Sequence, residues 1–258
     1  MFSTLGIASE ALVMRGRSTF EEREDYIIQR SPLEPEYWFG NQIVFRQFPE
    51  SLDEAQQVFV QAFPDAAHCV FSFDLPDGAV PQWAEDLQGY EVDHTDILVL
   101  TGSISGPQLP DGFQFRKITN DADWEQLIEL QLQTEVDQGY PVETHRPFIE
   151  TKFQQIRSRC EKSDFAWFGL FDGEALAADM GITWDDEIAR FQSVETRPEY
   201  QRKGLCAALL VKVVEQVRLV SPHCRFVIAA AANEGPGRIY RRAGFVHQET
   251  IVSLTKEG

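Results

Sequence analysis

Cysteine and histidine are sparse in this sequence, and neither forms a metal-ligand pattern. The four cysteines show no paired spacing, and no two of the five histidines stand four residues apart. Structural zinc sites need closely spaced Cys or His ligands, and disulfide-stapled folds are small and rich in cysteine. We therefore expect no metal and no disulfide framework. Free thiols also favour a reducing compartment, which predicts a cytoplasmic location. The cysteines are Cys69, Cys160, Cys206 and Cys224.

Long hydrophobic runs are missing as well. No segment approaches the roughly 20 consecutive apolar residues that a membrane-spanning helix needs. The first ten residues carry no cationic stretch ahead of an apolar core, which is the pattern of a secretory signal. We expect neither a membrane span nor an export signal.

Basic residues are few, with 23 Lys and Arg against 41 Asp and Glu and a formal net charge of −18. Nucleic acids and anionic membranes attract cations, so this balance argues against both as general partners. The deficit is uneven along the chain. Residues 1–110 hold 18 acidic and five basic residues, whereas residues 190–243 hold ten basic and four acidic ones. The second segment suits a small polyphosphate ligand.

The length of 258 residues and a hydrophobic fraction of 43% are typical of a folded chain with one large or two small domains. Gly, Pro and Ser gather at residues 101–112 between two apolar regions, which is typical of a linker. We place the domain boundary there, with an N-terminal α/β accessory domain at residues 1–110 and a second domain at residues 111–258.

The first of these domains is predicted to be a small α/β unit without a catalytic motif. Ser51 and Glu54 form a capping box at the start of its clearest helix. The predicted helices cover residues 7–24, 51–63 and 81–87, and the predicted apolar or strand segments cover residues 26–29, 43–48, 69–73 and 97–100.

The second domain shows a clearer alternation of strands and helices, which predicts an α/β fold with a mixed, partly parallel sheet. A hairpin with an Asp-Gly turn is expected at residues 172–173. The predicted strands cover residues 113–118, 165–171, 175–183, 188–194, 226–231 and 245–254, and the predicted helices cover residues 119–133, 146–161, 205–220 and 235–243.

A basic turn, Gln201-Arg-Lys-Gly204-Leu-Cys206, joins the strand at residues 188–194 to the helix at residues 205–220. A helix N-terminus presents unpaired N–H groups and the positive end of the helix dipole, and Gly204 leaves room for a ligand. Arg202 and Lys203 oppose that dipole unless an anion binds there. The turn predicts a diphosphate site; a solvated turn before an ordinary amphipathic helix is the alternative. Neither a Walker motif nor Gly-x-Gly-x-x-Gly is present.

A second motif follows the strand at residues 226–231, where Asn233 precedes Tyr240 by seven residues and Gly244 and Phe245 come next. The two motifs, in this order and separation, resemble the GNAT (Gcn5-related) N-acetyltransferase superfamily over roughly residues 113–255. The basic turn is similar to the family's Gln/Arg-x-x-Gly-x-Gly/Ala loop, with Cys206 where Gly or Ala is usual. Pro236 stands where Ala is common.

The resemblance implies a GNAT fold in residues 111–258 and acetyl transfer from acetyl-CoA to a primary amine by direct attack on the thioester. It makes Tyr240 the general acid for the departing thiolate and places an N–H near Val194 at the thioester carbonyl. The cofactor-binding residues that it implies are Val194, Thr196, Gln201, Arg202, Lys203, Gly204, Leu205, Cys206, Ala207, Asn233, Gly237 and Tyr240.

The general base stays open at this point. Glu195 lies next to the implied acetyl site, but alternate strand residues face opposite sides, so its side chain can also point away. An ordered water is another alternative, as are the charged residues that flank the loop at 139–141. These are Glu135, Asp137, Glu143 and His145.

The N-terminal domain also resembles a degenerate half of the same fold. Trp83 to Tyr90 followed by residues 97–100 is similar to Tyr240 to Phe245 followed by residues 251–254, yet the domain lacks a basic turn. An unrelated accessory domain is the alternative.

We expect an N-acetyltransferase, monomeric or homodimeric, with a cationic acceptor such as a polyamine, aminoglycoside, amino acid or protein N-terminus. A non-catalytic acyl-CoA sensor and a peptide-recognition protein are the competing hypotheses.

Overall fold

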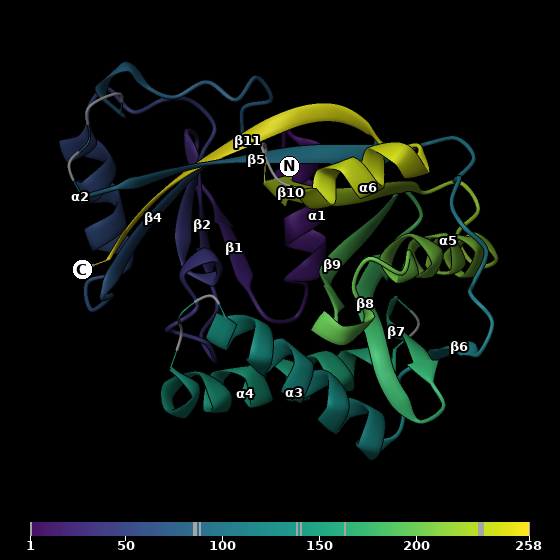
Figure 1. The fold of residues 1–258 in the computed structure, drawn as a ribbon. Helices are drawn as coiled ribbons and strands as arrows, with labels where there is room; N and C mark the ends of the chain where they lie inside the picture. The colour runs from purple at the N-terminus through teal and green to yellow at the C-terminus, as the bar shows by residue number, and fades with distance from the viewer. Residues whose placement is uncertain are drawn as a thin grey trace. The chain divides into compact units, whose positions relative to one another are not determined.

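The computed structural model describes residues 2–84, 87, 89–137, 139, 141–162, 164–231 and 235–257 (Figure 1). The chain forms two compact units. The first comprises residues Met1–Leu98, Ala229–Gly237 and His247–Gly258, and the second comprises Val99–Ile228 and Arg238–Val246. Residues 247–258 thus pack with the N-terminal segment. The boundary at residue 110 as a limit of independent folding stays a prediction.

The first unit is a mixed sheet with the strand order β1-β2-β3-β4-β11-β5. Neighbouring strands are antiparallel at β1/β2, β2/β3 and β4/β11, and parallel at β3/β4. Its elements are α1 (Leu5–Val13), β1 (Thr19–Glu22), β2 (Tyr26–Arg30), η1 (Trp38–Gly40), β3 (Gln42–Phe45), α2 (Leu52–Ala62), β4 (His68–Phe73), η2 (Gln82–Ala84), β5 (Glu91–Leu100) and β11 (Val246–Glu257).

The helix α2 packs on the sheet of the first unit through Ala55 and Phe59, one turn apart and both buried. Their core cluster includes Phe71 of β4 and Leu254 of β11. The N-cap of the capping box predicted at Ser51 is confirmed, because Ser51 Oγ accepts a hydrogen bond from Glu54 N at 3.2 Å. The returning bond goes one residue further, since Glu54 Oε2 accepts from Glu50 N. The N-terminal unit therefore has its own apolar core.

The helix predicted over residues 7–24 is wrong in its second half. Helix α1 begins after Thr4, whose side chain caps it, and ends at Val13. Gly16 has a φ of +81°, in the left-handed region that ends a right-handed helix. The chain then turns and enters strand β1.

The second unit contains strands in the order β10-β9-β8-β7-β6. The pair β9/β10 is parallel, as predicted, and the pairs from β9 to β6 are antiparallel. Its elements are β6 (Phe113–Lys117), α3 (Asp121–Asp137), α4 (Val142–Cys160), β7 (Phe165–Asp172), β8 (Ala175–Trp184), β9 (Ile188–Thr196), η3 (Pro198–Tyr200), α5 (Leu205–Arg218), β10 (Arg225–Ala231) and α6 (Gly235–Ala243).

Strand β7 has every side chain from Phe165 to Phe171 buried, so both of its faces are covered. Phe165, Trp167 and Phe171 belong to a core cluster with residues of α3 and α4. Helix α5 contacts β7, β8 and β9. The predicted Asp-Gly turn joins β7 to β8, with Gly173 at a φ of +59°.

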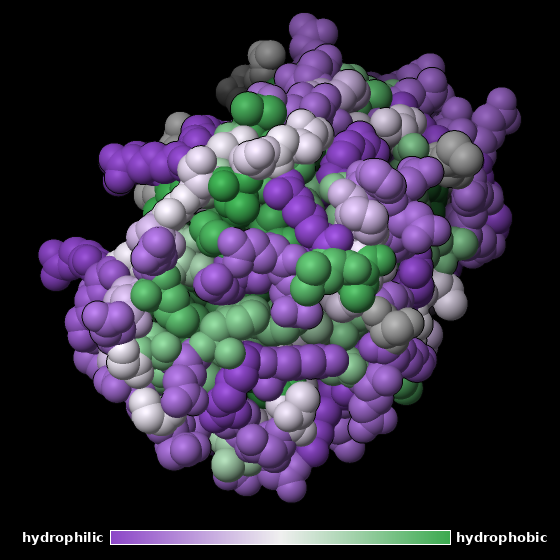
Figure 2. All heavy atoms as spheres, turned by 90° about the vertical axis from the view of Figure 1, so that its right-hand side faces the viewer, coloured by the Kyte–Doolittle hydropathy of each residue, from purple (hydrophilic) through white to green (hydrophobic). Residues whose placement is uncertain are grey.

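In Figure 2, hydrophilic residues predominate around the surface facing the viewer, and hydrophobic residues gather across its middle. In the described part of the chain, no helix combines the length and the apolar character that a membrane span requires.

Candidate active site

Strand β9 carries a bulge at the position where the sequence predicts the acetyl site. The register with β8 steps from Gly181↔Gln192 to Asp179↔Glu195, so two residues of β9, Ser193 and Val194, stand against one residue of β8. Ser193 has a φ of +44°, which few non-glycine residues adopt. A bulge interrupts the regular ladder and redirects the backbone groups beside it. Val194, half-buried, therefore lies in backbone that can face a ligand.

The basic turn follows the end of β9. Gln201 Nε2 donates a hydrogen bond to the Thr196 carbonyl at 3.2 Å, which ties the turn to the strand. Arg202 and Gly204 both have positive φ, +60° and +78°, and reverse the chain into helix α5. Arg202 is strained in this conformation whereas glycine is not. Local geometry thus explains why Gly204 stands there.

The N-terminus of α5 is open. Gly204 is its N-cap and makes no side-chain capping hydrogen bond, and the first helical turn, described in full, holds no acidic residue. Arg202, Lys203 and Gly204 are exposed, whereas Leu205 is buried, and Cys206 and Ala207 are half-buried. Lys203 Nζ lies 4.7 Å from the centre of the Tyr200 ring. The first N–H groups of a helix need partners, so this end can receive an anion.

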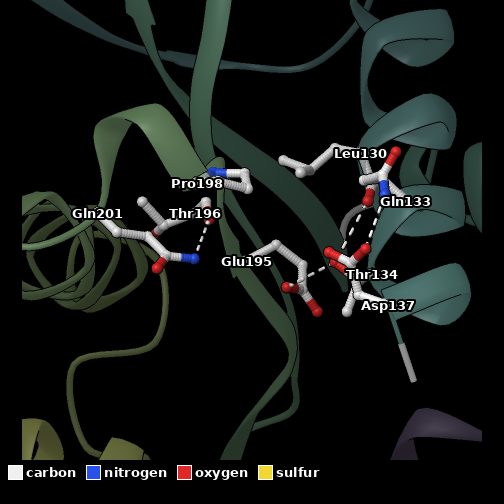
Figure 3. Close-up of a pocket in the computed structure, with 8 residues that line it drawn as sticks. All are labelled: Leu130, Gln133, Thr134, Asp137, Glu195, Thr196, Pro198 and Gln201. Carbon is white, nitrogen blue, oxygen red and sulfur yellow. Dashed lines mark hydrogen bonds between the residues drawn. The ribbon is translucent and has the colours of Figure 1, made fainter.

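A cavity of about 200 Å³ lies between α3 and the end of β9 (Figure 3). One wall of the cavity is formed by α3, with Thr134 and Asp137. The other wall is formed by β9 and the turn that follows it, with Glu195 and Gln201. Within the described lining, carboxylates are the only charged groups. The full lining is Leu130, Gln133, Thr134, Asp137, Glu195, Thr196, Pro198 and Gln201.

Glu195 points into this cavity toward Thr134. Thr134 Oγ1 lies 3.1 Å from Glu195 Oε2 and 3.2 Å from the Leu130 carbonyl. Burial raises the pKa of Glu195, and the Thr134 hydrogen bond and Lys152 oppose that shift. The hydroxyl can donate to an ionised Glu195, or donate to the Leu130 carbonyl and accept from a protonated one. Both protonation states of Glu195 thus have a partner.

Asp179 is the residue near the site that sequence reasoning missed. It is the cross-strand partner of Glu195, and such partners share a face of the sheet. Its side chain is fully buried, and its Oδ1 accepts a hydrogen bond from Trp167 Nε1 at 2.8 Å. Burial is the main cause that raises the pKa of Asp179 well above its usual range, and the charge of Glu195 adds to it.

Oδ2 of this carboxyl group has no hydrogen-bond partner among the described residues, and neither has Gln131 Nε2. Gln131 is still near enough to lower the pKa of Asp179. Gln131 and Thr134 are three residues apart on α3 and therefore lie on the same face of the helix. This face is the one that meets Asp179 and Glu195. Only the register of β8 against β9 could have revealed this pair. A protonated Asp179 leaves Glu195 as the one ionised carboxylate of the pair.

Tyr240 lies in α6 and is only 5% exposed. Burial raises its pKa above the usual range, and nearby Cys206 and Glu195 raise it further. Burial also raises the pKa of the Cys206 thiol to about 11. Both groups therefore keep their protons at neutral pH. A neutral phenol can donate a proton or a hydrogen bond to an anion.

The remaining predicted residues occupy other positions. Gly237 is buried in α6. Asn233 lies outside the described residues. Asp137 lines the cavity, whereas His145 Nε2 faces Glu135 Oε2 at 3.5 Å and Glu143 is exposed. Among the residues that the structure describes, no group of three His, Cys, Asp or Glu side chains could hold a metal ion.

Comparison with known proteins places part of the chain in a family. Residues 124–245 match the acetyltransferase (GNAT) family. No curated protein matches the sequence.

Solved structures share the fold over nearly the whole chain at low sequence identity. A GCN5-related N-acetyltransferase from Kribbella flavida has a TM-score of 0.65 at 16% identity, covering 99% of this chain and 97% of its own. A tandem GNAT protein from the clavulanic acid biosynthesis pathway has a TM-score of 0.59 at 14% identity, covering 97% and 87%. A protein of unknown function from Staphylococcus epidermidis has a TM-score of 0.71 at 13% identity, covering 92% and 93%. The predicted α/β fold class is thereby confirmed, and the fold of the N-terminal half is also shared with these structures.

Proposed function

Because residues 124–245 match the acetyltransferase (GNAT) family, we propose that the chain binds acetyl-CoA and transfers the acetyl group to a primary amine. The observation that carries this proposal is the open N-terminus of α5 directly after the bulged strand β9. The helix end fits a pyrophosphate, and the bulged backbone beside it fits the arm that links pyrophosphate to thioester.

Bound acetyl-CoA supplies an activated acyl thioester. An amine arrives as an ammonium ion and must lose a proton before its nitrogen can form the new C–N bond while the C–S bond breaks. Glu195 accepts that proton, since its carboxylate lies in the cavity and burial brings its pKa closer to neutral pH. An N–H of the bulge near Val194 stabilises negative charge on the carbonyl oxygen. Tyr240 donates its proton to the departing thiolate and takes up the second proton that the nitrogen loses as the amide forms.

The charge of the cavity supports a cationic acceptor. Glu195 and Asp137 line it, and none of its described lining residues is basic. Carboxylates attract an ammonium group and hold it near the base.

The first test is binding followed by turnover. Acetyl-CoA should raise the melting temperature of the native protein, since a ligand that binds only the folded state stabilises it. A screen of amines, aminoglycosides, amino acids and peptides that follows release of free CoA should then identify the acceptor. No thermal shift at saturating acetyl-CoA would refute the proposal.

Tyr240→Phe separates an enzyme from an acyl-CoA sensor. The variant removes one hydroxyl from a ring that otherwise keeps its packing against Phe245, at a centroid distance of 6.4 Å. We expect acetyl-CoA affinity to persist and turnover to fall by about a hundredfold, within the range for loss of a general acid. Binding by the native protein without turnover of any acceptor would favour the sensor.

A further inference from the structure

A second cavity, of about 330 Å³, lies in the N-terminal unit at the side of helix α2. One wall is a single face of α2, because Gln56, Phe59, Val60 and Phe63 recur at helical spacing. The rest is built by the loop after α2, by β4, by Tyr90 and by β11. The lining beyond α2 is Pro64, Ala66, His68, Cys69, Tyr90 and Lys256.

The cavity has one polar end. Gln56 Nε2 donates a hydrogen bond to Tyr90 OH at 3.0 Å. Lys256 Nζ lies 5.4 Å from the centre of the Tyr90 ring. Cys69 of β4 is the cross-strand partner of Lys256 of β11, so the two side chains share a face of the sheet beside Tyr90. An amide, a phenol, a thiol and an ammonium group thus gather at one place.

The opposite end is apolar. Phe59 and Phe63 contact each other with ring centroids 4.9 Å apart, and Val60 is 59% exposed. Arg30 is occupied at this end, since its Nη1 donates to the Ala62 carbonyl at 2.5 Å and its guanidinium lies 4.7 Å from the Phe63 ring centre. It therefore satisfies a terminal carbonyl of α2, and its guanidinium is a second cation, held against the Phe63 ring.

Lys256 has no carboxylate within ion-pair distance in the part of the chain that the structure describes. His68 does not add a second free donor, because its Nε2 is 3.1 Å from the Asn41 carbonyl. A half-buried ammonium without a counter-ion, next to an apolar wall, fits a ligand that carries a single negative charge.

The polar groups at this end bind rather than react. Burial raises the pKa of the Cys69 thiol to about 11, and burial also raises the pKa of Tyr90. Both stay protonated at neutral pH, so neither is a nucleophile. A phosphorylated ligand would bring two charges to one cation, whereas a carboxylate matches it.

We propose that this cavity binds a small monocarboxylic acid with an apolar body, the carboxylate at Lys256 and Gln56 and the body along Phe59, Val60 and Phe63. A cavity of this size lies at the lower end of the range for small-molecule sites. The proposal is independent of acetyl transfer, since it uses residues of the N-terminal unit.

The test uses the full chain and octanoate as the probe, with 1-octanol as the uncharged analogue, in calorimetric titrations. We expect saturable one-to-one binding of octanoate. Lys256→Met should weaken octanoate by about tenfold, the effect of losing one hydrogen bond to a charged group, and leave 1-octanol unchanged. Lys162→Met, the same change at an exposed position of the other unit, should alter neither.

Val60→Asp provides a second variant that does not disturb the core, because Val60 is largely exposed. It should weaken octanoate and 1-octanol alike. Circular dichroism checks that each variant is folded. The proposal is overturned by the absence of saturable octanoate binding to the native protein, or by equal octanoate affinity in Lys256→Met and Lys162→Met. Acetyl-CoA binding in the same samples reports separately on the proposed function.

Discussion

Two helices of this protein begin in opposite ways. At α2, Ser51 accepts from Glu54 N, and Glu54 Oε2 accepts in turn from Glu50 N at 2.7 Å. Asp53 adds a second carboxylate in the same turn. At α5, Gly204 offers no capping side chain and the cations Arg202 and Lys203 precede it. The end of α2 is neutralised by its own carboxylates, whereas the first turn of α5 holds none, so that its N-terminus can accept an external anion.

The two cavities also differ in charge, and here the C-terminal unit is the acidic one. The cavity beside β9 contains Glu195 and Asp137 and no cation in its described lining. The cavity beside α2 contains Lys256 and no carboxylate in its described lining. The helix end that suits an anion thus lies in the same unit as an acidic cavity, and the proposed function assigns acetyl-CoA to the first and the cationic acceptor to the second.

The largest effect is expected from giving α5 the capping box of α2. The double variant Gly204→Ser/Ala207→Glu recreates the spacing of Ser51 and Glu54 and places a carboxylate where a diphosphate would bind. We expect acetyl-CoA affinity to fall by at least about a hundredfold, as measured by calorimetry. The double variant Gly204→Ser/Ala207→Gln, uncharged at the second position, should lose less. Equal affinities for the native protein and the charged variant would show that α5 does not hold the diphosphate.

The next largest effect is expected on the pH dependence of stability, through the buried carboxyl group of Asp179. The pKa of Asp179 is raised in the folded state, so above its unfolded pKa the folded state holds a proton that the unfolded state has lost. Stability should then decrease as pH rises from near 4 toward the folded pKa, by up to about 1.4 kcal/mol per pH unit from this group. Asp179→Asn should flatten that slope in urea denaturation between pH 5 and 8. An unchanged slope would mean that Asp179 is ionised in the folded state.

A smaller effect is expected from removing the N-terminal cap of α2. Ser51→Ala removes the N-cap hydrogen bond and should lower the free energy of unfolding by about 1 kcal/mol. Acetyl-CoA affinity should not change, because α2 takes no part in the proposed site. Ser3, whose backbone N–H donates to Asp74, provides a matched Ser→Ala control away from α2, and its substitution should be nearly neutral. A loss of acetyl-CoA affinity in Ser51→Ala would indicate that acetyl-CoA binds to the N-terminal unit, and would contradict the proposed site at α5.

The smallest effect is expected from Arg202→Gln. Removing one exposed cation at the end of α5 should weaken acetyl-CoA by about threefold at low salt, and less at high salt. The same change should slightly stabilise the ligand-free protein, since a cation there opposes the helix dipole. Thermal melts with and without acetyl-CoA at two salt concentrations measure both the weaker binding and the higher stability of the ligand-free variant. Destabilisation of the ligand-free variant would contradict the dipole argument.

Local signals in the sequence located most elements of the fold. The capping box at Ser51, the Asp-Gly turn at residue 173 and the basic turn before α5 each depend on a few neighbouring residues, and each predicted element is present. The helix predicted over residues 7–24 failed because its apolar stripe is weak and Gly16 adopts a left-handed conformation.

The candidate site was less accessible to sequence reasoning, because its charges meet across strands. The pairing of Asp179 with Glu195 depends on a bulge that shifts the register of β9. Whether Glu195 points into or away from the cavity depends on that same shift. The cavity of the N-terminal unit likewise depends on the pairing of Lys256 with Cys69, residues far apart in the chain.

The position of β11 has a consequence for synthesis. The last strand pairs with β4 and supplies Val252 and Leu254 to the first unit's core, and Glu249 Oε1 accepts a hydrogen bond from Gly6 N across 243 residues of sequence. The N-terminal half of a nascent chain emerges from the ribosome long before these residues. The edge of β4 therefore stays unpaired until β11 has been synthesised. Contacts between residues so far apart in the sequence also form slowly. Loss of the last dozen residues would therefore damage the end of the protein that is made first.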